Sequence, residues 1–260
     1  MSEGKFDNSY GLADIHSDLF EIMQFIHKIC LENDIQYSLT GGSLLGAIRH
    51  GGFIPWDDDF DIMFDRANYE KFLSVMRSYD QGDYFLEADQ WVYRVRKEHK
   101  TKGFVASIDL FVIDEVPMSN LKNKLQVLTL RFIQGMLRTN EKEGNFSLFY
   151  RVAIAVTELL GKLFNKEKLF KKYDKLSRMG NGENSGKISI FNDRFKLVSL
   201  QYDANLTETY ELKPFHDAEF MIIGRYDDYL TAQFGDYMTP PPEGEQGGHD
   251  LQLGEIEWKI

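Results

Sequence analysis

Residues 41–64 read GGSLLGAIRHGGFIPWDDDFDIMF, and this stretch decides the fold. It opens with two glycines and a serine, which are typical of a tight turn, and continues into a short apolar segment expected to form a helix over residues 44–49. From residue 57 to residue 64 apolar and acidic side chains alternate, which is the period of a β-strand. We therefore predict a glycine turn, a short helix and an acidic strand in close succession.

Four carboxylates fall within five positions of this stretch: Asp57, Asp58, Asp59 and Asp61. Ionised carboxylates held close together repel one another, and a divalent cation offsets that repulsion. On a strand, Asp57, Asp59 and Asp61 would share one face and present hard oxygen ligands to Mg²⁺ or Mn²⁺. A solvated acidic surface is the alternative, but these acids alternate with apolar residues and follow a glycine turn, which favours a metal site.

Three other sites that use similar residues are excluded. An EF-hand loop counted from Asp57 needs glycine at the sixth position and glutamate at the twelfth, where this chain has Ile62 and Asn68. The glycine-rich turn has no lysine of the kind a Walker P-loop requires, and no dinucleotide fingerprint is present. What remains is a Gly-Gly-Ser turn that opens a helix, where backbone N–H groups can bind phosphate.

The rest of the chain alternates between helical and strand patterns, which indicates an α+β fold. The apolar period predicts helices over residues 13–33, 67–77 and 226–233, and a helical region over residues 120–177 with a break near residues 144–145. Strands are expected over residues 35–40, 84–86, 91–96, 104–111, 188–191 and 218–223, with 112–113 as a further short piece.

Composition excludes several classes of protein. The 260 residues include 30 Lys and Arg against 41 Asp and Glu, a formal net charge of −11, so a general nucleic-acid binder is not expected. An apolar fraction of 43% is enough for a core. Cys30 is the one cysteine, which rules out an intrachain disulfide. No run resembles a signal peptide or a membrane span, so we expect a cytoplasmic protein.

The charge is unevenly distributed. Residues 120–178 hold 13 basic and five acidic side chains, a net charge of +8 in an otherwise acidic chain. Within this segment, apolar residues between Leu148 and Phe170 lie largely on one helical stripe. Such a stripe usually packs on a core. The basic surplus suggests a second role, contact with an anionic membrane surface or with a lipid-pyrophosphate-linked glycan.

The blocks GGSLLGAIRH and GFIPWDDDFDI closely resemble the LicD-type phosphotransferases, whose relatives include bacterial phosphocholine transferases and fukutin-type ribitol-phosphate transferases. The resemblance continues through residues 64–72, 108–114 and 229–238. It implies a nucleotidyltransferase-like fold, with a mixed-sheet core flanked by helices and a basic helical insertion. We accordingly expect a catalytic core over residues 1–118, a basic helical segment over 119–180, and a C-terminal part over 181–260 that completes the catalytic domain.

The resemblance assigns roles to the carboxylates. Asp59 and Asp61 match the metal-binding pair of the superfamily, and Asp57 matches the additional acid before it. Asp109, on a separate strand, matches the third carboxylate, which completes the metal site or accepts a proton from the acceptor hydroxyl. Asp114, at the end of that strand, is expected to be a turn or capping residue. The predicted catalytic residues are thus Asp59, Asp61 and Asp109, and the predicted metal ligands are these three with Asp57.

The predicted substrate-binding residues lie in or near the glycine turn. They are Gly41, Gly42, Ser43, Arg49, His50 and Trp56. Arg49 could bind a phosphate in bidentate fashion. A quaternary ammonium would favour an aromatic cage, for which the candidates are Trp56, Trp91, Tyr93 and Tyr237. The basic cluster Arg94, Arg96, Lys97 and Lys100 is either a contact for donor phosphates or a solvated strand end. His249 lacks the basic residue that often precedes this histidine in the family.

The resemblance implies a Mg²⁺-dependent transfer, with Mn²⁺ as an alternative ion, of a phospho-substituent from a nucleoside diphosphate-linked donor such as CDP-choline. The acceptor would be a sugar hydroxyl of a cell-surface glycan precursor, lipid-linked or free, reached in the cytoplasm or at the inner face of the membrane. Two alternatives stay open: a nucleotidyltransferase that moves a nucleoside monophosphate, and an inactive relative that only binds.

Overall fold

The computed structural model describes residues 6–79, 83–88, 90–98, 105–137, 156–242 and 246. The chain divides into two compact units. Unit 1 comprises Met1–Ala88, Tyr93–Phe111 and Asn205–Ile260, and unit 2 comprises Asp89–Val92 and Val112–Ala204. The predicted division at residues 118 and 180 stays a prediction.

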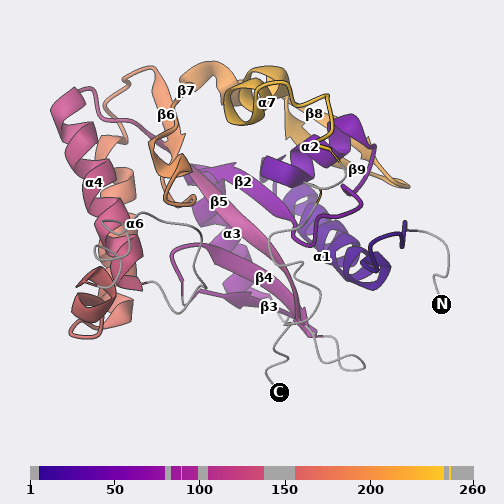
Figure 1. Ribbon diagram of the computed structural model, residues 1–260, viewed down its shortest axis with the longest axis horizontal. Coiled ribbons are helices and arrows are strands. Elements are labelled where there is room, and N and C mark those ends of the chain that lie inside the picture. The colour runs from indigo at the N-terminus through magenta and orange to yellow at the C-terminus, as the bar shows by residue number, and fades with distance from the viewer. Residues whose placement is uncertain are drawn as a thin grey trace. The chain divides into compact units, whose positions relative to one another are not determined.

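Unit 1 contains a sheet in the order β1-β2-β5-β4-β3 (Figure 1). Its strands are β1 (Ser38–Leu39), β2 (Asp61–Asp65), β3 (Tyr84–Glu87), β4 (Tyr93–Glu98) and β5 (Val105–Glu115), the last of which ends in unit 2. The pairs β1 with β2, β3 with β4 and β4 with β5 are antiparallel. Helices α1 (Ala13–Glu32), α2 (Gly41–Arg49) and α3 (Arg66–Ser78) belong to the same unit. The α+β class predicted from the sequence is confirmed.

Helix α1 forms because its apolar residues recur at the helical period and bury one face. Ile22, Met23 and Ile26 are fully buried there, and the helix contacts β4 and β9. Helix α3 is capped by Asp65, the last residue of β2, whose carboxylate accepts a hydrogen bond of 2.8 Å from the Asn68 N–H. The predicted helices over residues 13–33 and 67–77 are therefore confirmed to within one residue.

The C-terminal elements of unit 1 are the hairpin β8 (Tyr210–Phe215) and β9 (Ala218–Ile223) and helix α7 (Tyr226–Phe234). The Ile223 N–H donates a 3.0 Å hydrogen bond to Ser38 Oγ, so the hairpin is joined to β1. The hydroxyls of Thr40 and Tyr229 lie 2.5 Å apart and join the start of α2 to α7. Strand β8 was not predicted. It contains Pro214, and proline usually argues against a strand, although an edge strand tolerates it.

Unit 2 is built on two long helices, α4 (Asn120–Leu137) and α6 (Lys166–Ser177), and the strands β6 (Lys187–Ile190) and β7 (Tyr202–Asp203). Its core includes Leu130, Leu169 and Phe191. The buried Tyr173 hydroxyl donates a 2.6 Å hydrogen bond to the Phe191 carbonyl, so the polar atom in this core is satisfied. The predicted helix break at 144–145 lies outside the described residues.

Two strand predictions were too long. Residues 57–60 do not belong to a strand, since β2 begins only at Asp61. The Asp57 N–H bonds to the Ile54 carbonyl at 3.0 Å, so the chain turns through Pro55 and Trp56 before it extends. Of the strand expected over residues 35–40, only Ser38 and Leu39 pair with a neighbour.

Within the described residues, no helix combines the length and the apolarity needed to cross a lipid bilayer.

Gly46 in α2 is expected to tolerate no side chain. A Cβ at this position would lie 2.5 Å from the Gly52 carbonyl oxygen, a backbone atom that cannot rotate away. In an exposed helix, Gly→Ala stabilises by about 1 kcal/mol, whereas here we expect Gly46→Ala to lower the free energy of unfolding, by about 1–3 kcal/mol. Urea unfolding of the two proteins measures this difference, and a more stable variant would contradict the close packing of the two segments.

Candidate active site

The start of β2 is fixed against the start of α2 by two hydrogen bonds. The Asp61 N–H donates to Ser43 Oγ at 2.8 Å, and the Thr40 N–H donates to the Asp61 carbonyl at 3.1 Å. Ser43 and Asp61 are both buried, so these bonds satisfy polar groups that water does not reach. The serine predicted to bind phosphate therefore has a structural contact with the first residue of the acidic strand.

The two glycines lie directly beside two of the predicted metal ligands. A Cβ on Gly42 would overlap the Asp57 carboxylate, and a Cβ on Gly41, whose φ is +52°, would lie 3.3 Å from Asp61 Oδ2. At position 42 only glycine leaves room for the Asp57 carboxylate. At position 41 glycine adopts the positive φ more easily than any other residue. Asp57 and Asp61 thus face the same two-residue segment, although the two acids do not share a strand.

The glycines also form the first turn of α2, which begins at Gly41 and not after Ser43 as predicted. The first N–H groups of a helix lack partners within the helix and attract anions. The backbone of this turn and the carboxylates of Asp57 and Asp61 therefore meet at one place, which suits a phosphate group accompanied by a cation.

The acidic segment is held from its other side by His16 of α1. Its Nε2 lies 2.7 Å from the Asp57 carbonyl oxygen, and its ring stacks on Phe53 with centroids 4.3 Å apart. Burial lowers the pKa of His16, which favours the neutral ring with the proton on Nε2, where it can donate to the carbonyl. No signal in the sequence pointed to His16, because it occupies an ordinary position in an amphipathic helix.

Asp109 lies on β5 opposite Arg94 of β4. The Asp109 N–H donates to the Phe60 carbonyl at 3.0 Å, which places β5 next to the residue that precedes β2. The Arg94 guanidinium binds both carboxylate oxygens, with Nε to Oδ1 at 2.6 Å and Nη2 to Oδ2 at 3.3 Å. This is the bidentate arrangement that gives arginine–carboxylate pairs their strength.

The charge on Arg94 responds to more than one acid. Burial alone would lower its pKa, but the carboxylates of Asp109, Glu87 and Asp61 outweigh burial and raise it. Arg94 therefore stays protonated and feels the field of two predicted catalytic acids, Asp61 and Asp109. The structure brings these two acids and one arginine into the same electrostatic environment.

The other described cations of the predicted basic cluster also face acids. Arg96 Nη2 lies 2.7 Å from Glu87 Oε2, and Lys97 Nζ lies 2.5 Å from Glu21 Oε2 and 3.3 Å from Asp18 Oδ1. Arg96 and Lys97 therefore each have an acidic partner within the protein. Lys100 lies outside the described residues, and a contact of this cluster with donor phosphates stays a prediction.

Arg49, His50 and Trp56 lie together at the end of α2. Arg49 Nη1 donates a 2.8 Å hydrogen bond to the Tyr237 carbonyl, which ties α2 to the segment after α7. The rings of His50 and Trp56 meet edge to face with centroids 6.0 Å apart, and burial together with the neighbouring Arg49 charge lowers the pKa of His50. Their predicted role in binding substrate stays a prediction.

The candidate cage aromatics each contact a different partner. Trp56 meets Tyr10, Trp91 packs near Tyr173, Tyr93 packs near Tyr69, and the Tyr237 hydroxyl donates to Asp227 Oδ1. A cage formed by these residues stays a prediction, and His249 lies outside the described residues.

Asp114 is buried in β5, where its carboxylate accepts a 2.7 Å hydrogen bond from the Asn181 amide. It therefore lies within the strand and does not form a turn, because β5 continues to Glu115.

The side chains fit a magnesium or manganese ion as ligands, since Asp57 and Asp61 offer hard oxygens beside the glycine turn. Among the described residues, however, no three His, Cys, Asp or Glu side chains already stand in a geometry that would hold a metal ion. Asp109, one of the four predicted ligands, has both of its oxygens bound by Arg94. The predicted ligand set of Asp57, Asp59, Asp61 and Asp109 therefore stays a proposal.

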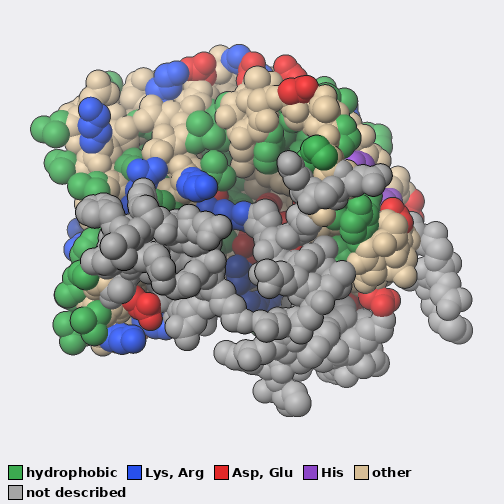
Figure 2. All heavy atoms as spheres, in the orientation of Figure 1, with side chains coloured by type: hydrophobic (Ala, Val, Ile, Leu, Met, Phe, Trp, Pro, Cys, Tyr) green, Lys and Arg blue, Asp and Glu red, His purple; other side chains and the backbone are tan. Residues whose placement is uncertain are grey.

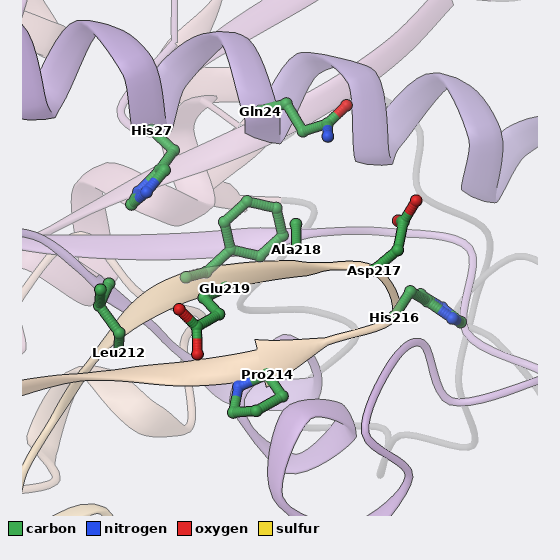
Figure 3. Close-up of a pocket in the computed structure, with 9 residues that line it drawn as sticks. Gln24, His27, Leu212, Pro214, His216, Asp217, Ala218 and Glu219 are labelled. Carbon is green, nitrogen blue, oxygen red and sulfur yellow. The ribbon is translucent and has the colours of Figure 1, made fainter.

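A separate open pocket of about 680 Å³ lies between α1 and the β8–β9 hairpin (Figure 3). Gln24 and His27 reach it from α1, and Leu212, Glu219 and Phe220 reach it from the hairpin. None of the predicted site residues lines this pocket, so it is distinct from the acidic segment.

Residues 34–131 match the family described as LicD/FKTN/FKRP, nucleotidyltransferase domain. This part of the chain is therefore similar to a LicD-type domain. The matched range contains the glycine turn, the acidic segment, Arg94 and Asp109, which are the features brought together above.

Named relatives match over different lengths. The chain is 26% identical to the lipopolysaccharide cholinephosphotransferase LicD of Haemophilus influenzae over an alignment of 270 positions. This alignment covers 90% of this chain and 94% of that protein. It is 46% identical over 44 residues to the ribitol 5-phosphate transferase FKRP of mouse and of human, a match that covers 17% of this chain and 9% of FKRP. The resemblance to LicD-type transferases predicted from the sequence is confirmed by these matches.

Among solved structures, the chain is similar to small alarmone synthetase 1 of Bacillus subtilis, bound to AMPCPP, with a TM-score of 0.24 and 9% identity. The match covers 65% of this chain and 98% of that one. A TM-score this low does not support a shared fold.

Ser43 is expected to matter for stability as well as for any bound phosphate. Ser43→Ala removes the oxygen that accepts from the buried Asp61 N–H, and an unpaired buried donor costs about 1–3 kcal/mol of unfolding free energy. Chemical denaturation without ligands measures this loss. The matched control is Ser78→Ala, where the serine is exposed at the end of α3 and donates to the Val75 carbonyl. Equal stability of the two variants would contradict a structural role for Ser43.

Proposed function

We propose that this protein is a divalent-metal-dependent phosphotransferase that moves a phospho-substituent from a CDP-linked donor to a sugar hydroxyl of a cell-surface glycan precursor. The observation that carries the proposal is the approach of Asp57 and Asp61 to Gly41 and Gly42 at the first turn of α2. Carboxylates and helix N–H groups meet there as a metal-bound pyrophosphate requires.

Each part of the site has a role in this reaction. The N–H groups of the first turn of α2 bind donor phosphate oxygens. Asp57, Asp59 and Asp61, with Asp109, would hold the metal. A bound Mg²⁺ or Mn²⁺ supplies neutralisation of the negative charge that develops on the leaving nucleotide.

The remaining groups serve the acceptor and the geometry. Asp109 would orient the attacking hydroxyl or accept its proton. Arg94 would hold the Asp109 carboxylate in one orientation, because it donates to both carboxylate oxygens. His16 fixes the backbone of Asp57 through its hydrogen bond to the carbonyl.

Similarity to relatives supports the class of reaction. A protein named lipopolysaccharide cholinephosphotransferase matches 90% of this chain, and a ribitol 5-phosphate transferase matches a shorter part. Choline, ethanolamine, glycerol and ribitol all remain candidates for the transferred group. The acceptor would be a lipopolysaccharide, teichoic acid or capsule precursor, free or lipid-linked, reached at the cytoplasmic side of the membrane.

The mass of the product distinguishes this reaction from its main rival. A phosphotransferase adds phosphocholine or a similar group to the glycan and releases CMP. A nucleotidyltransferase would instead add a nucleoside monophosphate. An inactive binding relative would give neither product.

The acidic segment permits a test with a control inside the same run of residues. Asp59→Asn and Asp61→Asn each remove one negative charge from the proposed metal site, so we expect CMP release to fall by about 10³-fold or more. Asp58→Asn changes the same charge at a position outside the proposed ligand set, so we expect most of the activity to remain. A coupled assay of CMP, with thermal melting to verify folding, measures both effects. Full activity of the Asp61 variant would refute the proposed site.

Arg94 provides a test that does not depend on turnover. Because its positive charge occupies Asp109 and opposes a divalent cation, Arg94→Gln is expected to tighten Mn²⁺ binding by roughly five- to tenfold while it slows transfer. The matched control is Arg96→Gln. Arg96 lies on β4 like Arg94 but pairs with Glu87 of β3, so this variant should change the affinity little. Electron paramagnetic resonance of free Mn²⁺ measures the affinity. Weaker binding in the Arg94 variant would show that the arginine supports the metal site and does not compete with it.

A further inference from the structure

Helix α4 is apolar on two opposite faces. One face belongs to the core of unit 2, where Leu130 and Ile133 are buried. The opposite face carries Leu121, Leu125, Leu128 and Phe132, which are 69%, 54%, 65% and 46% exposed. The spacing of four, three and four residues places these side chains on one narrow stripe, which we call the α4 stripe. A helix that only covered a core would present polar residues there.

The exposed apolar surface continues beyond α4. The helical residues 156–161 pack closely on the end of α4, since a Cβ on Gly161 would overlap the Met136 carbonyl. Leu159 and Leu163 are 65% and 76% exposed in this neighbouring segment. Figure 2 shows hydrophobic side chains gathered over α4, with Lys and Arg among them. Single exposed leucines are ordinary, whereas a row of this length marks an interaction surface.

This position differs from the stripe expected between Leu148 and Phe170. Part of that stripe lies outside the described residues, and of its described members Val156, Leu159, Leu163 and Phe164 are exposed, while Leu160 and Phe170 pack against the core of unit 2. Residues 120–137 were predicted to be helical, as α4 is, but the second apolar face of this helix was not recognised in the sequence.

Charge indicates what covers the α4 stripe. Residues 120–178 carry a net charge of +8, and on the helical wheel Lys124 and Arg131 lie on one side of the stripe. Arg131 donates to the Phe195 carbonyl and to Ser199 but faces no acid in these bonds, whereas Lys122, on the other side, pairs with Glu183. Two copies of this positive surface would repel each other, which disfavours a dimer. Nucleic acid would satisfy the basic side chains but not the leucines. Leucine and phenylalanine flanked by lysine and arginine suit the boundary between the headgroups and acyl chains of an anionic membrane.

We propose that the α4 stripe docks this protein on an anionic lipid surface. The leucines and Phe132 enter the headgroup region, and the basic side chains of the segment face the acidic headgroups. The proposal concerns unit 2 alone and does not depend on which phospho-substituent is transferred, so it can fail while the proposed function holds.

A fluorescent label on the stripe tests insertion directly. Cys30 is fully buried, and burial raises the pKa of its thiol, so a maleimide dye is expected to react only with an introduced cysteine. Leu128→Cys labelled with an environment-sensitive dye should shift to the blue with phosphatidylglycerol vesicles. The shift should be small with phosphatidylcholine vesicles and should weaken as salt is added. Leu212→Cys, 50% exposed in β8, is the control and should not shift.

Vesicle flotation of the unlabelled full chain tests affinity. Leu125→Glu combined with Leu128→Glu should weaken binding to phosphatidylglycerol vesicles roughly tenfold or more, because two leucines lose apolar contact and two negative charges are added. Leu31→Glu, at a 55% exposed position of α1, should bind as the wild type does. All three positions are exposed, so circular dichroism melting should show folded proteins.

Three outcomes would overturn the proposal. The first is equal binding of the wild type to anionic and neutral vesicles, or no binding to either. The second is full binding by the double variant. The third is self-association in sedimentation velocity that the double variant abolishes, without vesicle binding, which would make the stripe an interface between two copies of the chain.

Discussion

The proposed site depends on one close contact, the packing of the acidic segment against the glycine turn at the start of α2. The Asp61 N–H to Ser43 Oγ bond and the Thr40 N–H to Asp61 carbonyl bond fix the two segments together. The missing side chains of Gly41 and Gly42 then admit two carboxylates that would otherwise be excluded. Without this contact the acids would form an ordinary solvated loop, because like charges separate when nothing holds them.

The N- and C-terminal parts of the chain both support that contact. His16 holds the Asp57 carbonyl from α1, and Tyr229 of α7 meets the hydroxyl of Thr40 at the start of α2. Arg49 at the other end of α2 binds the Tyr237 carbonyl. The glycine turn and helix α2 are therefore held in part by residues 188 and 189 positions further along the chain.

The overall charge of −11 combines two surfaces of opposite sign. In unit 1, acids gather around the glycine turn and are balanced in part by Arg94. In unit 2, the basic surplus lies near an apolar stripe on α4. The first surface suits a cation and a pyrophosphate, and the second suits an anionic lipid surface. Neither is visible in the net charge.

From the sequence alone, several helices and strands and the residue types of the acidic motif could be recognised. The periodicity of α1 and α3 follows from their apolar residues, and the acidic run after a glycine turn indicated a metal and a phosphate. The tertiary structure decided which groups face each other. Arg94 binds Asp109 because β4 and β5 pair in one register, and His16 reaches Asp57 because α1 packs beside that loop. The strand predicted over residues 57–64 was wrong for residues 57–60, because a turn through Pro55 precedes β2, which begins at Asp61. Alternation and composition report the neighbours along the chain, whereas the contacts across a sheet or between helices depend on register and packing, which a single sequence does not specify.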